Sequence, residues 1–188
     1  MASLVSLLLF FLAGGPFGTI NDVGNGVVGV LSGLLAWTLR SVDTSRAATA
    51  QAVVVGVAAL GAAVTVVGSV LVVSGSTGFL LAGLVSSVGF ALIGLWLFAL
   101  NWSMREEERW SRWLPKLGIV AGALMAVGIT ALPGILIRVD DMESAPSWVW
   151  IGFLGWIGVY VLYPVWSICF GSLLLGRSLM PDAQGSRP

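Results

Sequence analysis

The chain has 188 residues and no net charge, with 57% hydrophobic and only 10% charged residues. A soluble domain carries roughly 25% charged residues, so the composition excludes water as the main solvent of this chain. The mean hydropathy of +0.99 predicts an all-α integral membrane protein with the lipid bilayer as its surroundings. Zero net charge removes the electrostatic basis for binding nucleic acid.

Histidine is absent, and there is one cysteine, Cys169. Without histidine, the chain cannot form histidine-ligated haem sites, histidine-containing zinc or copper sites, or Ser-His-Asp triads. The single lysine, Lys116, stands at the edge of an apolar run. We therefore expect no catalytic residues, no metal and no cofactor, and a protein that is not an enzyme.

The N-terminal apolar run covers residues 4–13. As a helix it would rise about 15 Å, half the thickness of a hydrocarbon core. Glycine and proline at residues 14–16 would end it. We predict a short interfacial or half-inserted helix, which is retained because no basic residue precedes it and no small-residue cleavage site follows.

Longer apolar runs follow, each near the roughly 20 residues that cross a bilayer core. They predict a bundle of five transmembrane helices over residues 18–39, 48–74, 79–102, 117–137 and 148–175. Residues 1–176 then form a single membrane domain, and residues 177–188 form a polar C-terminal tail. Residues 105–116 mix arginine, glutamate and tryptophan, a composition that predicts a short amphipathic helix on the membrane surface.

Basic residues are distributed unevenly over the segments between these runs. Eight of the nine lie within residues 40–46, 105–116 and 177–187, and the ninth is Arg138. Because cytoplasmic segments carry the excess of lysine and arginine, the N-terminus is expected outside and the C-terminus in the cytoplasm.

The first span contains the most polar stretch of any apolar run, with Thr19, Asn21, Asp22 and Asn25. The two asparagines are four residues apart and therefore share a helix face, with the aspartate beside them. A carboxylate in hydrocarbon costs about 2.5 kcal/mol or more on insertion scales, so it needs water, a partner or a cation. Two interpretations stay open: a site for a small ion or solute, and a helix cap at the start of the span.

Small residues at four-residue intervals predict close helix packing. The first span has Gly29 and Gly33, and the fourth has Gly118, Gly122 and Ala126.

The fifth span carries an aromatic stripe of Trp156, Tyr160 and Tyr163 at positions i, i+4 and i+7. Ordinary aromatic packing is the expected role, and an apolar ligand pocket is the alternative. Pro164 predicts a kink.

Two functional hypotheses follow. The first is a non-catalytic membrane subunit or scaffold whose small-residue faces pack against a second copy or a membrane protein partner. The second is a small transporter or channel for an ion or solute, with its polar site around Asp22.

Overall fold

The computed structural model describes residues 5, 6, 8, 9, 12, 17–41, 47–107, 110–143 and 145–178. Within these ranges the regular structure is entirely helical and contains no strand. Five helical spans are long and apolar enough to cross a membrane, as the sequence predicts. The chain thus has the composition and architecture of a multi-pass membrane protein.

The first three spans are continuous helices, named α2 (Phe17–Leu39), α3 (Ala48–Val73) and α4 (Phe79–Met104). The fourth span comprises α5 (Trp113–Ala126), the 3₁₀ segment η1 (Val127–Ala131) and α6 (Leu132–Leu136). The fifth comprises α7 (Val149–Gly152), α8 (Leu154–Ile157), the π-helical segment η2 (Gly158–Leu162) and α9 (Tyr163–Ser178). Their bounds differ from the predicted ones by four residues or fewer.

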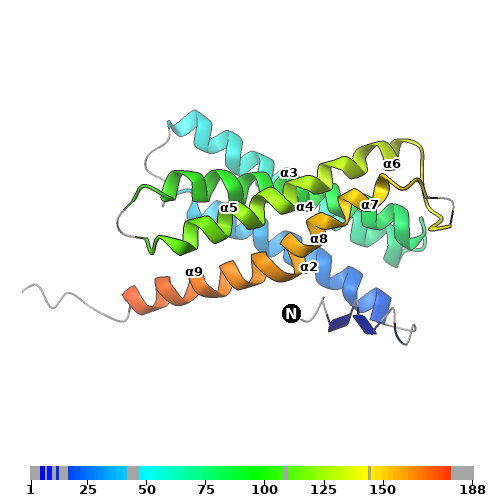
Figure 1. Ribbon diagram of the computed structural model, residues 1–188, viewed down its shortest axis with the longest axis horizontal. Coiled ribbons are helices and arrows are strands. Elements are labelled where there is room, and N and C mark those ends of the chain that lie inside the picture. The colour runs from blue at the N-terminus through cyan, green and yellow to red at the C-terminus, as the bar shows by residue number, and fades with distance from the viewer. Residues whose placement is uncertain are drawn as a thin grey trace, which may run out of the picture.

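Helix α4 is the centre of the bundle. In its most apolar stretch 72% of the residues are buried, against 28% to 33% in the other four spans. It packs along α3 on one side and α5 on the other, while α2 lies against α3 and the fifth span crosses the same bundle (Figure 1). The four outer spans therefore leave broad apolar faces uncovered by protein.

Small residues allow the helices of this bundle to approach closely. A Cβ built at Gly122 would lie 2.6 Å from the Gly94 carbonyl oxygen of α4. A Cβ at Gly29 would lie 3.0 Å from Cβ of Thr65, and one at Gly33 would lie 3.1 Å from Cβ of Ala62. Close approach of this kind, made possible by small residues, is a usual source of dispersion energy between membrane helices.

Prolines change the helix type in the last two spans. Pro133 lies in the first turn of α6 and has no N–H to donate to the preceding turn, which is 3₁₀. Pro164 lies just after η2, where the wider π turn accommodates its ring and missing donor. The fifth span, predicted over residues 148–175 with a kink at Pro164, is thus divided into α7, α8, η2 and α9.

The amphipathic helix expected over residues 105–116 is not present as such. Residues 113–116 belong to α5, and the described residues 105–107 and 110–112 form turns and bends. The Trp110 indole N–H donates to the Glu107 carboxylate at 3.1 Å, and its ring stacks on Phe170 of α9 at 5.4 Å. This tryptophan is 5% exposed, so the segment closes one end of the bundle.

The opposite end is closed by the segment between α6 and α7. The Asp140 carboxylate accepts hydrogen bonds from the backbone N–H groups of Gly78, at 2.6 Å, and Leu81, at 3.1 Å. These groups belong to the first turn of α4, whose own cap residue is a glycine without a side-chain acceptor. Asp140 thus caps the central helix from a distant loop.

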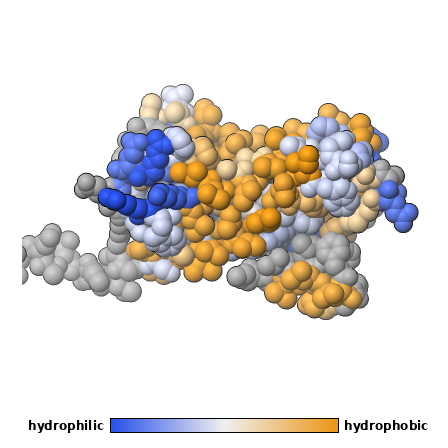
Figure 2. All heavy atoms as spheres, viewed as in Figure 1, coloured by the Kyte–Doolittle hydropathy of each residue, from blue (hydrophilic) through white to orange (hydrophobic). Residues whose placement is uncertain are grey.

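An apolar band separates hydrophilic residues at the two ends of the visible face (Figure 2). At one end the Arg40 guanidinium lies 3.8 Å from the ring centre of Trp37, and Arg105 lies 3.6 Å from that of Trp102. Tryptophan and arginine in contact are typical of the membrane–water interface.

Two predicted segments fall largely outside the described residues. Of the N-terminal run at residues 4–13, only residues 5, 6, 8, 9 and 12 are described, and they do not establish the predicted helix. Of the tail, residues 177 and 178 still belong to α9, and residues 179–188 lie outside the described part.

Candidate functional site

Three of the four polar residues singled out in the first span face the interior of the bundle. Asn21 is 2% exposed, Asp22 is 9% exposed and Asn25 is 8% exposed. Thr19, by contrast, is exposed and lies outside this group. Asp22 lies in the second turn of α2, inside the helix, so it is not the N-cap that the second interpretation required.

Tyr160 of η2 reaches this group from the fifth span. Its hydroxyl lies 3.1 Å from Oδ1 of Asn25 and 3.3 Å from Oδ1 of Asn21. The side-chain amide of Asn21 in turn donates a longer bond of 3.4 Å to Oδ1 of Asp22. In the sequence, Tyr160 is 135 residues from Asn25 and 139 residues from Asn21.

A cavity of about 20 Å³ lies against these side chains, which is room for about one water molecule. Its wall includes the start of α4 and the end of α3, where Phe79, Gly83 and Val72 line it. Further polar lining comes from Ser86, Ser87 and Trp156. We refer to the cavity with Asn21, Asp22, Asn25 and Tyr160 as the Asp22 site.

The wall opposite α2 is fixed by its own hydrogen bonds. Ser87 donates to the Gly83 carbonyl at 2.8 Å and accepts from the Trp156 indole N–H at 3.1 Å. Trp156 in turn contacts Tyr160 edge to face, with ring centres 6.0 Å apart. Trp156 and Tyr160 of the aromatic stripe therefore pack against each other, and the polar tip of each reaches a buried partner at the cavity.

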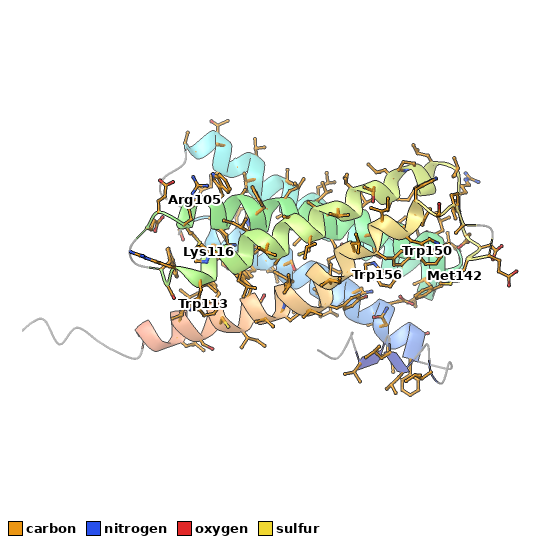
Figure 3. All side chains as sticks on the ribbon, in the orientation of Figure 1. Arg105, Trp113, Lys116, Met142, Trp150 and Trp156 are labelled. Carbon is orange, nitrogen blue, oxygen red and sulfur yellow. The ribbon has the colours of Figure 1, made fainter. Side chains whose placement is uncertain are left out.

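Charge at the Asp22 site is unbalanced. Among the described residues that line the cavity, Asp22 is the acidic one and none is basic. The labelled basic side chains Arg105 and Lys116 lie at the far end of the bundle from Trp156, which marks the cavity (Figure 3). Within the described lining of the cavity, the carboxylate thus has an amide partner and no basic side chain beside it.

A second buried polar pair, which the sequence did not reveal, lies near the other end of α4, where Trp166 of α9 contacts it. Asn101 of α4 is 0% exposed, donates to the Leu97 carbonyl at 2.8 Å and accepts from the Trp166 indole N–H at 2.9 Å. Gly118 of α5 packs directly against its side-chain amide. Between the two lies a third contact, in which the hydroxyls of Ser32 and Tyr163 are 2.8 Å apart.

The remaining predicted packing residue, Ala126, lies on the α4–α5 contact, where a Cβ at Gly94 would come 3.0 Å from its backbone nitrogen. Cys169 is half-buried in α9. Within the described ranges no three histidine, cysteine, aspartate or glutamate side chains gather as a group that could hold a metal ion.

The chain was compared with protein-family models, curated proteins and solved structures, and none of them matches it.

Proposed function

We propose that this chain is a five-span membrane protein with its N-terminus outside and its C-terminus in the cytoplasm. The uneven distribution of basic residues supports this orientation, because eight of nine fall in the segments assigned to the cytoplasmic side. Two of these residues, Arg40 and Arg105, contact Trp37 and Trp102, as is typical of residues at a membrane–water interface. In this orientation the Asp22 site lies in the outer half of the bilayer, about 8 Å along the helix axis from Phe17.

We further propose that the protein is a small ion or solute transporter or channel, with the Asp22 site as its binding site. One observation carries this proposal: a 9% exposed carboxylate and two buried amides converge with a tyrosine hydroxyl on a water-sized cavity. Ionisable groups inside a membrane bundle mark ion and solute paths because their burial is otherwise costly. No catalytic role enters this proposal.

The packing of the small residues also favours transport over the scaffold hypothesis. Gly29 and Gly33 contact α3, and Gly118 and Gly122 contact α4. These faces are filled within one chain, so they are not available to hold a partner.

The test is gradient dissipation in proteoliposomes. Purified protein would be reconstituted with imposed gradients of sodium, potassium or protons, followed with ion- and pH-sensitive dyes. We expect the wild type and the control Tyr163→Phe to dissipate at least one gradient faster than protein-free liposomes, and Asp22→Asn to match the protein-free rate. Equal rates for the wild type and empty liposomes under all three gradients would contradict the proposal.

A separate observation favours a second candidate function, a subunit of a larger membrane assembly. Helix α3 carries an outward stripe of small, exposed residues: Ala52, Gly56, Ala59 and Ala63. A Cβ at Gly56 would meet no atom within 4 Å, so another helix could approach closely there. Native mass spectrometry of wild type and Gly56→Leu would test this: a complex lost in the variant supports the subunit role, and monomers in both contradict it.

A further inference from the structure

At the Asp22 site, the side-chain oxygens of two asparagines compete for one hydroxyl proton. The Tyr160 hydroxyl has one proton, yet the side-chain oxygens of Asn21 and Asn25 both lie within accepting distance of it, at 3.3 and 3.1 Å. At any moment, therefore, only one of the two amide oxygens can accept a full hydrogen bond from the Tyr160 hydroxyl. The Asp22 carboxylate adds two further acceptor atoms, and among the described residues Asn21 donates one long bond, to Oδ1.

The Asp22 site carries one negative charge when the Asp22 carboxylate is ionised. Asp22 is 9% exposed, and no basic side chain is among the described residues that line the cavity. An ionised carboxylate in such surroundings is costly unless a positive charge accompanies it. A single positive charge makes the site neutral.

We infer that the Asp22 site binds one dehydrated monovalent metal cation of about the size of sodium, with oxygens of Asp22, Asn21 and Asn25 as ligands. This inference rests on the proposed function in taking the Asp22 site as the binding site, and it names the class of ligand. Carboxylate and amide oxygens are the hard ligands that such cations prefer over nitrogen or sulfur.

Charge and space both favour a monovalent ion over a divalent one. A divalent cation would leave one uncompensated positive charge inside the bundle. Calcium takes six to eight oxygen ligands, commonly several carboxylates, and magnesium retains several waters. The cavity has about 20 Å³, which is space for one water-sized particle and not for a hydrated ion.

Neutral surroundings supply the rest of the binding pocket. Ser87 is held by Gly83 and Trp156, so its hydroxyl is already engaged on both sides. The wall has open space beside Gly83, where a Cβ would meet its nearest atom, Cζ2 of Trp156, only at 4.0 Å. The cation would thus occupy a space whose walls are already formed, and α2 supplies the charged ligand.

The test is sodium-dependent thermal unfolding of the detergent-purified full chain, followed by tryptophan fluorescence. Sodium chloride would replace N-methyl-D-glucamine chloride at constant ionic strength. We expect a saturable rise in the midpoint of about 5 °C or more at high occupancy for the wild type. The same rise is expected for Tyr163→Phe, which removes a hydroxyl outside the cavity, and no rise for Asp22→Asn.

Binding of radioactive sodium to the same samples gives a second measurement that does not depend on unfolding. We expect one displaceable sodium ion per wild-type chain and none in Asp22→Asn. A midpoint that does not respond to sodium, or a response retained in Asp22→Asn, would overturn the inference, as would the absence of bound sodium.

The two proposals fail in different ways. Sodium binding without dissipation of any gradient contradicts transport and leaves the cation site in place. Dissipation of a proton gradient without sodium binding contradicts the cation site and leaves transport in place.

Discussion

The Asp22 site and the Asn101–Trp166 pair contain similar polar groups. They differ in how completely the hydrogen-bonding groups and the charge have partners. In both, the fifth span brings an aromatic donor to a buried amide. Asn101 has partners for both ends of its amide and lies against Gly118 with no space left. At the Asp22 site two amide oxygens share one hydroxyl proton, and the carboxylate brings one negative charge to a water-sized cavity. Burial of polar groups alone therefore does not identify a binding site; an unmatched charge beside free space does.

The largest expected effect comes from placing a carboxylate at the Asn101–Trp166 pair. Asn101→Asp would introduce a charge at a 0% exposed position without a cation, and the free energy of unfolding should fall by about 3 kcal/mol. The reverse exchange, Asp22→Asn, should leave it unchanged or raise it in sodium-free buffer, because it removes an uncompensated charge. Thermal unfolding of both variants checks this, and an equal loss in both would remove the distinction between the sites.

Glycine-to-alanine exchanges compare the space at the two sites. Gly118→Ala places a methyl group against the Asn101 amide and should cost about 1–3 kcal/mol by overpacking. Gly83→Ala, beside the cavity, meets its nearest atom at 4.0 Å and should be neutral or slightly stabilising through helix propensity. Unfolding midpoints measured in parallel would contradict the packing described here if Gly118→Ala were the milder change.

Tyrosine hydroxyls provide a matched pair with a smaller expected effect. Tyr160→Phe and Tyr163→Phe each remove one interhelical hydrogen-bonding group between α2 and the fifth span. Each should cost about 0.6 kcal/mol, the average for such bonds in a membrane. Only Tyr160→Phe should also change sodium affinity, which sodium titration of both variants measures. Equal sodium affinities would place the Tyr160 hydroxyl outside the cation site.

A final exchange concerns Gly56, where α3 faces away from the bundle. Gly56→Ala adds a methyl group that meets no atom within 4 Å. It should stabilise the monomer by up to about 1 kcal/mol through helix propensity. Loss of stability on this exchange would indicate that the stripe is already covered in the purified protein.

Hydropathy was sufficient to predict the five helical spans because each apolar run is long and bounded by charged or glycine-containing turns. It could not predict the change to 3₁₀ or π geometry, since Pro133 and Pro164 disturb the helix in ways that depend on neighbouring helices. The segment at residues 105–116 was misjudged because Trp110 is buried against Phe170 instead of lying at the membrane surface.

The α2 half of the Asp22 site was visible in the sequence because three polar residues cluster in one apolar run. Its other half was not, because Tyr160 is more than 130 residues away and its contact depends on how the fifth span crosses α2. Asn101 gave one signal that could have been used: it is the only amide residue in the predicted span 79–102. A lone amide in a long apolar run needs a buried partner.

The most direct measurement of the central claim, that Asp22 is a buried carboxylate matched by a bound cation, is its chemical modification in membranes. A hydrophobic carbodiimide reaches carboxyl groups from the lipid phase, and mass spectrometry locates the modified residue. We predict that Asp22 is modified in sodium-free buffer, and that sodium slows the modification while N-methyl-D-glucamine does not. Modification of Asp22 at the same rate with and without sodium would contradict a cation at this site.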